Sequence, residues 1–282
     1  MAELAAELET REERTARPIR APQIRFWSGL WPKLVAIFLA VAVWQVVVWS
    51  GWRPANVLPG PLPVFHRLFD DLNRVDFYAG LGITLQRALL GYWIAVAIGS
   101  VAGILIARVT ILRKAVGSAI LGLQSMPSIA WLPLAVLLFQ HSEPAIIFVV
   151  VLGAGPAIAS GLLSGVDHVE PLLVRVGRAM GAHGLVLYRH VILPAALPSF
   201  VGGLKQGWAF AWRSLMAAEL IVVGGHQASL GQQLRVAENF TSAEQLVALM
   251  IVIFVIGVAV DSLFSALDRA IRRRWGLLGA AT

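Results

Sequence analysis

Six long apolar stretches dominate this sequence, and each is close to the ~20 residues that an α-helix needs to cross the hydrocarbon core of a bilayer. The stretches cover residues 34–51, 88–107, 115–139, 144–163, 194–223 and 246–267, and Pro127 and Pro133 interrupt the third. Their lengths suit helices and exceed those of barrel strands. The sequence therefore predicts an all-α integral membrane protein with six transmembrane helices.

Composition agrees with a membrane location. Hydrophobic residues make up 58% of the chain and charged residues 14%, whereas a soluble domain carries about 25% charged residues. The chain has no cysteine, which excludes disulfides, thiolate metal sites and cysteine nucleophiles. We expect a tail over residues 1–33, a transmembrane domain over 34–267 and a second tail over 268–282.

The first apolar stretch has a rival interpretation as a signal peptide, because Ala40-Val41-Ala42 resembles a cleavage site. The apolar run continues beyond that point through Val46, Val47 and Val48. It is long enough to cross a bilayer, so we interpret it as a retained first helix.

The distribution of positive charge predicts the orientation, since cytoplasmic loops carry an excess of Lys and Arg. With six spans, both tails and the loops after spans two and four lie on one side, and they hold most of the basic residues, among them Arg11, Arg14, Arg108, Arg113, Arg175, Arg178, Arg272 and Arg273. We therefore expect both termini in the cytoplasm. The net charge of +7 is explained in this way, and nucleic-acid binding is not expected.

The loop over residues 166–193 is too polar for lipid, yet it is not a simple linker. Residues 171–180 are compatible with a helix, Gly181-Ala182-His183-Gly184 follow, and residues 185–191 can form a second helix. Glycine supplies backbone angles that other residues resist. The pattern predicts two short helices around a glycine turn. This element projects into the cytoplasm and forms a protruding contact surface for a partner.

This loop resembles the cytoplasmic signature of binding-protein-dependent ABC permeases, which is Glu-Ala-Ala, three residues, Gly, nine residues, Ile, one residue and Leu-Pro. Here Gly181 is followed at the same spacing by Val191 and Leu193-Pro194. The chain departs from the signature at its start, where Arg175-Val176-Gly177 replaces Glu-Ala-Ala. The departure affects any contact that the glutamate makes, whereas the glycine turn is retained.

Further segments resemble the nitrate/sulfonate/taurine branch of that family. They are Thr84-Leu85-x-Arg87 with Gly91, Met126-Pro127-Ser128-Ile129-Ala130-Trp131-Leu132-Pro133-Leu134, Pro194-Ala195-Ala196-Leu197-Pro198, Ala211-Trp212 followed by Ala218-Glu219, and Ser229-Leu230-Gly231. Each motif alone is weak, but together they occur in the order that the branch shows, and the likeness covers roughly residues 84–267.

The resemblance implies a type I importer-like permease subunit in the bacterial inner membrane, surrounded by lipid. Its partners would be a second, identical permease, two cytoplasmic ATPase subunits and an extracytoplasmic solute-binding protein. ATP and Mg would bind the ATPase, and this chain would hold no cofactor. The solute would be a small anion, with sulfonate or taurine preferred and nitrate or bicarbonate as alternatives. The residues expected to couple to the ATPase are Arg175, Gly177, Arg178, Ala179, Met180, Gly181, Ala182, His183 and Gly184.

Polar residues at membrane depth mark a candidate translocation path. Lys205, Trp212 and Glu219 recur every seven residues and so share one helix face, with Trp208 beside it. Lys205 either favours an anion in the path or pairs between helices, for example with Asp261. Arg213 is expected to pair with another helix. Polar side chains beside the break at Pro127 are further candidates, with helix packing as their alternative role; they are Gln124, Ser125 and Ser128.

No catalytic or metal motif accompanies these features. The six histidines show no His-Glu-x-x-His pattern, and no Gly-x-x-x-x-Gly-Lys-Ser/Thr loop is present, so no Walker motif for ATP occurs in this chain. The sequence thus predicts a transport subunit and not an enzyme. A channel or an ion-coupled secondary transporter is the alternative, but neither accounts for a glycine turn that faces a partner.

Overall fold

The computed structural model describes residues 25–222, 228–240 and 242–274. Every regular element in these ranges is helical, which confirms the predicted fold class. The chain divides into two compact units, Met1–Pro54 and Ala55–Thr282. In the first unit the structure describes helix α2 (Arg25–Trp49). Residues 1–24 of the predicted tail 1–33 and residues 275–282 of the predicted tail 268–282 lie outside the described residues, and the described parts of both tails are helical.

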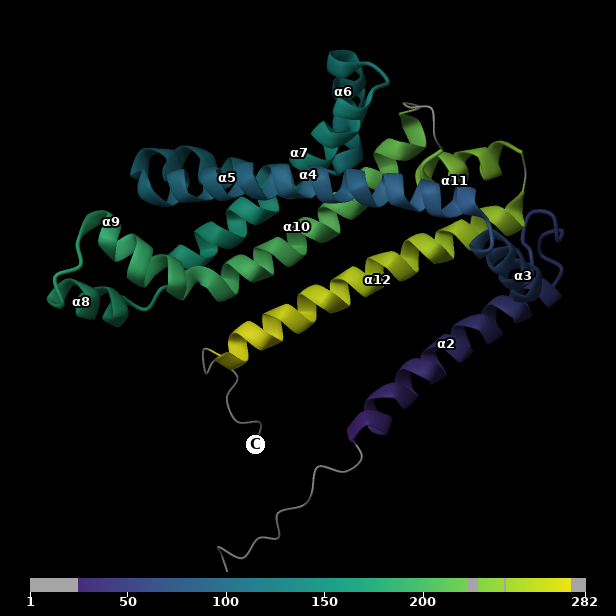
Figure 1. The fold of residues 1–282 in the computed structure, drawn as a ribbon, viewed down its shortest axis with the longest axis horizontal. Helices are drawn as coiled ribbons and strands as arrows, with labels where there is room; N and C mark the ends of the chain where they lie inside the picture. Colours follow the sequence, from purple (N-terminus) through teal and green to yellow (C-terminus); the bar gives the residue numbers. More distant parts are fainter. Residues whose placement is uncertain (1–24, 223–227, 241, 275–282) are drawn as a thin grey trace, which may run out of the picture. The chain divides into compact units, whose positions relative to one another are not determined.

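The second unit is a bundle of long helices with short helices at its two ends (Figure 1). The long elements α4, α7, α10 and α12 run between an end that carries α8 and α9 and an end that carries α3 and α11. The elements are α3 (Pro61–Leu72), α4 (Val75–Arg108), α5 (Thr110–Ser125), the 3-10 turn η1 (Ser128–Trp131), α6 (Leu132–Phe139), α7 (Glu143–Asp167), α8 (Pro171–Ala179), α9 (Gly184–Leu187), the π-helical segment η2 (Tyr188–Ile192), α10 (Leu193–Ile221), α11 (Leu230–Asn239) and α12 (Ala243–Arg274).

In the described chain, five helical segments are long and apolar enough to cross a membrane, and a bent pair of helices provides a sixth crossing if it counts as one span. The bent pair is α5 followed by η1 and α6, with an angle of 102° between its halves. The break falls at Pro127, as expected, because proline disfavours a helical conformation in the residue before it. Met126 is accordingly extended, with ψ of 128°. Pro133 differs from the prediction, since it lies in the first turn of α6, where its missing N–H costs nothing.

Two ion pairs show that the bent pair carries the chain from one end of the bundle to the other. Arg113 in α5 pairs with Asp167 at the end of α7, near α8. Glu143 at the start of α7 pairs with Arg87 of α4, whose Nη2 atom lies 2.8 Å from Oε1 of Glu143. The 25 residues of α7 separate these two points by about 36 Å at ~1.5 Å per residue, which exceeds the ~30 Å of a hydrocarbon core.

Helix α7 packs between α4 and α10 at very short range. A Cβ atom on Gly99 of α4 would lie 2.7 Å from the Gly155 carbonyl oxygen of α7. A Cβ atom on Gly161 of α7 would lie 2.4 Å from the Cα atom of Gly203 in α10. Small residues at these points let helix backbones approach closely in a membrane, where van der Waals packing drives association.

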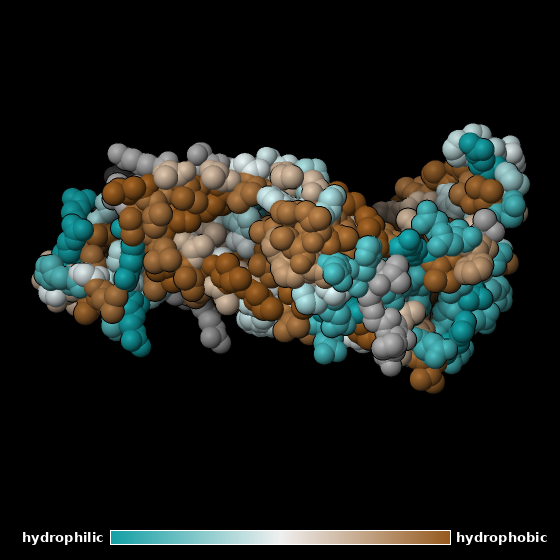
Figure 2. Space-filling view, turned by 90° about the horizontal axis from the view of Figure 1, so that it is seen from above, coloured by the Kyte–Doolittle hydropathy of each residue, from teal (hydrophilic) through white to brown (hydrophobic). Residues whose placement is uncertain are grey.

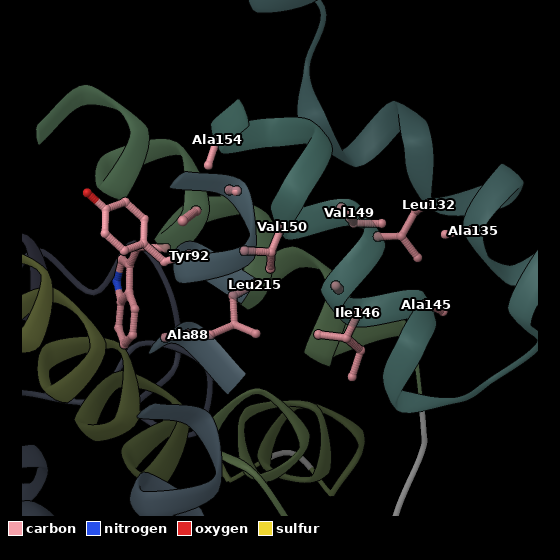
Figure 3. Close-up of a cluster of buried hydrophobic side chains, with 14 of the residues drawn as sticks. Ala88, Tyr92, Leu132, Ala135, Ala145, Ile146, Val149, Val150, Ala154 and Leu215 are labelled. Carbon is pink, nitrogen blue, oxygen red and sulfur yellow. The ribbon is translucent and has the colours of Figure 1, made fainter. Parts of the chain in front are cut away.

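Aliphatic and aromatic side chains fill the space around these contacts. Figure 3 shows Tyr92 of α4, Val150 and Ile146 of α7, and Leu215 of α10 within one buried cluster, which extends to Leu132 of α6. Figure 2 shows hydrophobic residues gathered over the long helices and hydrophilic residues toward both ends of the bundle. This distribution is the one that a bilayer imposes on a helical bundle.

Helix α10 does not begin at Pro194 as an isolated element. The chain is helical without interruption from Gly184, through α9 and η2, to Ile221. Pro194 has no N–H to donate to the carbonyl of His190, which lies in η2. A π-helical turn just before this point keeps the axis continuous, and such turns commonly mark functional sites.

Candidate functional site

The glycine turn between α8 and α9 forms as predicted. Gly181 adopts a φ of +87° and Gly184 a φ of +53°. The N–H of Gly181 donates to the Arg178 carbonyl and the N–H of Ala182 to the Gly177 carbonyl, each at 3.0 Å. This pair of bonds is a Schellman motif, which ends a helix with a left-handed glycine. The turn therefore depends on glycine at position 181.

Gly177 occupies the contact between the two short helices. A Cβ atom at this position would lie 2.9 Å from Leu187 Cδ1 and 3.0 Å from Val191 Cγ2. Gly177 and Leu187 are both buried, whereas the flanking Arg175 and Arg178 are exposed. The departure from Glu-Ala-Ala thus leaves a small residue at the packing position and replaces the glutamate by an exposed arginine.

The α8–α9 element is attached to the bundle through Tyr188. Its hydroxyl donates to the Ala107 carbonyl at the end of α4, at 3.4 Å, and the Arg108 guanidinium lies 4.8 Å from the centre of its ring. An open cavity of about 520 Å³ adjoins this contact and is lined by Arg108, Arg178, His183, Gly184, Leu185, Leu187 and Tyr188. The element therefore contacts α4 and is continuous with α10.

Lys205, the cation proposed for the path, is engaged in an interhelical pair. Its Nζ atom lies 3.2 Å from Asp261 Oδ1 and donates to Ser265 Oγ at 2.8 Å. Both partners belong to α12, so the contact joins α10 to the last long helix. The structure thus contains the pairing with Asp261 that the sequence offered as the alternative, and the role of Lys205 in the path stays a prediction.

The other members of the predicted stripe lie within the bundle. Trp208 and Trp212 are buried and stack with their ring centres 6.3 Å apart. Trp208 also meets Tyr92 of α4 edge-on at 5.2 Å and Phe264 of α12 at 6.2 Å. The aromatic side chains therefore hold α4, α10 and α12 together in the single chain.

The polar residues beside the Pro127 break lie in different environments. Gln124 donates from Nε2 to the Pro156 carbonyl of α7 at 3.2 Å. Ser125 is exposed and donates to the Gly122 carbonyl of its own helix at 2.8 Å. Ser128 is half-buried and lies next to Gly153 of α7, where an added Cβ atom would be 3.4 Å from Ser128 Cβ.

Arg213 differs from the sequence expectation. Its side chain is exposed and contacts only its own helix among the described interactions, where Nε donates to the Ala209 carbonyl at 3.1 Å and the guanidinium lies 5.2 Å from the Phe210 ring. The expected pairing with another helix is absent from the described chain. Helical periodicity gives a direction around the axis, but not the face that neighbouring helices of the same chain cover.

A buried polar cluster lies at the opposite end of the bundle and is centred on Glu219, which is 0% exposed. Its carboxylate accepts hydrogen bonds from Thr84 Oγ1 at 2.9 Å, from Arg87 Nη1 at 3.2 Å and from the Gly231 N–H at 3.1 Å. Thr84 Oγ1 in turn accepts from the Leu230 N–H at 3.0 Å. A charged group at this depth is stable because each oxygen is bonded and the charge is paired.

Helix α11 completes this cluster through its N-terminus. Ser229 caps the helix in a capping box with Gln232, and the free N–H groups of the first turn point to Thr84 and Glu219. The partial positive charge of a helix N-terminus favours a carboxylate there. A Cβ atom on Gly231 would lie 2.4 Å from Glu219 Cβ, so only glycine permits this approach.

The cluster explains three motifs that the sequence presented separately. Thr84-Leu85-x-Arg87, Ala218-Glu219 and Ser229-Leu230-Gly231 meet at one point. The sequence placed Glu219 near the mouth of the path but assigned no role to Thr84 or Arg87. A buried carboxylate requires a partner, and this requirement was the signal that could have linked Glu219 to Arg87. Among the described residues, no group of three or more His, Cys, Asp or Glu side chains could hold a metal ion.

Comparison with known proteins identifies the family of this architecture. The family described as "Binding-protein-dependent transport system inner membrane component" matches residues 78–273. The match includes the bundle, the α8–α9 element and the Glu219 cluster, which are the features that position every site described above.

Curated relatives are similar in sequence to this chain over most of its length. A probable ABC transporter permease of Brucella melitensis biotype 1 is 27% identical over 242 residues, covering 86% of this chain and 96% of the relative. The putative aliphatic sulfonates transport permease protein SsuC of Bacillus subtilis is 28% identical over 254 residues, covering 90% and 91%. The nitrate import permease protein NrtB of Leptolyngbya laminosa is 28% identical over 242 residues, covering 82% and 84%.

Solved structures share the fold. A chain of the MetNI methionine ABC transporter in an inward-facing conformation has a TM-score of 0.60 at 19% identity, covering 70% of this chain and 96% of that one. A chain of an amino acid ABC transporter with histidines has a TM-score of 0.53 at 21% identity, covering 71% and 94%. The predicted type I importer-like fold is confirmed.

The relatives named for sulfonate and nitrate transport confirm the branch that the sequence motifs indicated. The apolar helices and these relatives support a multi-pass protein of the inner membrane. The chain belongs to the binding-protein-dependent transport system inner membrane components and is the permease component of an ABC importer.

Proposed function

We propose that this chain is one of two identical membrane-spanning subunits of an ATP-driven importer for a small anionic solute. Two cytoplasmic ATPase subunits bind ATP and Mg, and an extracytoplasmic binding protein delivers the solute. The α8–α9 element is the observation that carries the proposal, because it lies at one end of the bundle in a chain of this family. Both termini and the α8–α9 element face the cytoplasm in this arrangement.

The surface of the α8–α9 element suits a protein partner. Its exposed side chains include Met180, which is 82% exposed, and Leu185, which is 65% exposed. Arg175 and Arg178 lie beside them and are also exposed. An apolar tip with basic flanks matches a groove that has an apolar floor and acidic walls. We assign that groove to the ATPase, where Arg175 meets a carboxylate in place of the contact made by the family's glutamate.

The helix is continuous from Gly184 to Ile221, so the ATPase can move α10 by moving the α8–α9 element. Displacement of the α8–α9 element moves α10, and with it the contacts to α12 at Lys205 and to α11 at Glu219. Alternation between inward-facing and outward-facing states follows if the ATPases bind the two states with unequal affinity, since a partner without such a difference shifts no equilibrium.

The proposed solute class rests on the relatives and on charge. Relatives named for aliphatic sulfonate transport and for nitrate import are similar to this chain over more than four-fifths of its length. We propose a sulfonate such as taurine as the solute, with nitrate and bicarbonate as the alternatives. The binding protein selects among them before the solute reaches this subunit.

Reconstitution tests the proposal directly. The chain is co-purified with a candidate ATPase and binding protein from the same organism and placed in liposomes, and uptake of labelled taurine, an alkanesulfonate, nitrate and bicarbonate is measured. We expect uptake of one of them that requires ATP and the binding protein. Replacing Gly181 by valine should abolish co-purification of the ATPase, since its φ of +87° excludes a β-branched residue. Uptake driven by an ion gradient without an ATPase would instead support a secondary transporter.

A further inference from the structure

The exposed face of α10 differs in composition from the exposed faces of the helices around it. The exposed side chains of α4 include Trp93, Ile98 and Val101, and those of α12 include Phe254 and Val258. Each is about half exposed or more. Such side chains are what contact with lipid requires. On α10, apart from Ile221 at its last position, the exposed residues are Gly202, Gln206 and Arg213.

These three residues form one stripe along the axis. Gln206 and Arg213 are seven residues apart, and Gly202 lies one turn before Gln206, so all three point within about 20° of one direction. Arg213 lies about 12 Å from the end of α10 at Ile221, and Gln206 lies about 22 Å from it. The stripe therefore extends from the outer part of the helix to its middle, where polar side chains are costly in lipid.

Arg213 is the charged member of the stripe, and no described carboxylate neutralises its charge. In the part of the chain that the structure describes, its contacts are the Ala209 carbonyl and the Phe210 ring, and no carboxylate pairs with it. The two other cations on long helices near this depth are neutralised, Lys205 by Asp261 and Arg87 by Glu219 and Glu143. The carboxylate nearest in sequence, Glu219, lies on another face and is fully buried.

We propose that the stripe of Gly202, Gln206 and Arg213 lines the water-filled path, and that the Arg213 guanidinium holds the anionic group of the solute. This assignment rests on the proposed import of an anion and moves the anion-binding role from Lys205 to Arg213. A sulfonate or nitrate group accepts two parallel N–H bonds from a planar guanidinium. Gln206 offers an amide to the same ligand deeper in the path.

A second copy of the chain completes the site. Two identical subunits related by a two-fold axis present the same face to each other, so two arginines approach the axis. Dry, tight packing of the stripes would leave two unpaired guanidinium groups buried, which costs several kcal/mol per ion. A hydrated path with an anion between the arginines removes this cost, and for that reason the stripe lines a path and not a sealed helix interface.

The absence of native cysteine permits a test that needs no knowledge of the solute. Single cysteines are introduced at Ala209 and Gln206 on the α10 face, and at Val101 and Val258 on the lipid-type faces, in the full chain purified with its ATPase. Reaction rates are then measured with anionic sulfonatoethyl methanethiosulfonate and with its cationic trimethylammonioethyl analogue. The Ala209 cysteine is repeated with Arg213→Gln and with Arg213→Lys.

We expect the cysteines at Ala209 and Gln206 to react and those at Val101 and Val258 to remain unreactive. At Ala209, one turn from Arg213, each rate is divided by that reagent's rate with a free thiol. The anionic reagent should then be favoured over the cationic one by about 25-fold, because one charge at ~4 Å in water changes the two rates about fivefold in opposite directions. Arg213→Gln should remove this preference and Arg213→Lys should keep it. If the Arg213→Gln variant does not assemble, the reactivity of the four cysteines and the reagent preference of the Arg213→Lys variant still test the assignment.

Two results would overturn the assignment. An unreactive Ala209 and Gln206 pair would show that the stripe is covered by protein or lipid. Equal rates with both reagents, each divided by the rate with a free thiol, would show that Arg213 does not govern the path. Neither result concerns the importer itself, because ATPase assembly and ATP-dependent uptake are measured separately on the unmodified chain. Loss of those two activities would instead refute the proposed function.

Discussion

At the scale of single residues, the Arg87–Glu219 pair is the most deeply buried charge interaction that the structure describes. The Arg87 side chain is 6% exposed and that of Glu219 is 0% exposed, while Glu143, which binds the same guanidinium, is 60% exposed. One arginine thus binds two carboxylates in very different surroundings. This arrangement provides a matched comparison within one cluster.

We expect Glu219→Gln to destabilise the chain by about 3 kcal/mol, because the buried Arg87 guanidinium loses its buried counter-charge and keeps only the exposed Glu143. Glu143→Gln removes the same charge from an exposed site, where an ion pair contributes less than about 1 kcal/mol. Thermal unfolding in detergent measures both variants, and Glu219→Gln should show the much larger fall in Tm. Equal falls would mean that burial does not control the strength of this cluster.

Gly231 is required by contact and not by backbone conformation. An alanine there would bring its Cβ atom to 2.4 Å from Glu219 Cβ, so α11 must move or the carboxylate must leave its hydrogen bonds. We expect Gly231→Ala to cost about 1–3 kcal/mol, the usual penalty for overpacking.

Gly82→Ala is the control for this change. No heavy atom lies within 4 Å of a Cβ atom built at Gly82 in α4, and alanine favours a helix over glycine by about 1 kcal/mol. The Tm of Gly82→Ala should therefore stay constant or rise. A fall like that of Gly231→Ala would point to a general intolerance of the bundle and not to the Glu219 contact.

At the scale of elements, the turn between α8 and α9 depends on particular glycines, whereas the exposed charges of the element do not contribute to the turn. Gly177 and Gly181 determine how the two helices pack and turn, whereas Arg175 is exposed and takes no part in either feature. The geometry of the element and the charge that it presents to a partner can therefore change independently.

Arg175→Glu restores the residue type of the family signature, and we expect it to weaken binding to the chain's own ATPase. The cause is electrostatic, since a groove that accepts an arginine has acidic walls that repel a glutamate. Binding of the purified ATPase at several salt concentrations measures the effect, which should be about tenfold at low salt and smaller at high salt. Arg273→Glu makes the same charge change on the exposed end of α12 and should leave binding unchanged.

The elements show what sequence reasoning can and cannot supply. The glycine turn and the break at Pro127 follow from local backbone chemistry, which the sequence states directly. The π-helical segment η2 precedes Pro194, but the packing of Tyr188 against α4 and of Leu187 against α8 depends on tertiary contacts, so spacing alone did not reveal the continuous run into α10. For the same reason the exposed side of Arg213 and the partners of Glu219 became visible only in three dimensions.

At the scale of the whole molecule, the number of crossings determines which end of the bundle meets the ATPase. If α5 and α6 cross together, the α8–α9 element lies on the same side as the predicted N-terminal tail; if they form a re-entrant loop, it lies on the opposite side. The Arg113–Asp167 pair attaches the start of this segment to the end of α7, whereas its finish at Phe139 leads directly into the start of α7 at Glu143. These two connections therefore favour six crossings.

Labelling of single cysteines in intact cells tests this topology. Val57 precedes α3, His141 lies between α6 and α7, and His183 lies in the turn between α8 and α9, and all three side chains are exposed. We expect an impermeant maleimide to label cysteines at Val57 and His141 from outside, and to reach His183 only after the membrane is opened. Labelling of His183 but not His141 in intact cells would contradict six crossings, because α5 and α6 would then return to the side from which they started. In that case the turn could not reach a cytoplasmic ATPase, and the coupling role of Gly181 would fail together with the topology.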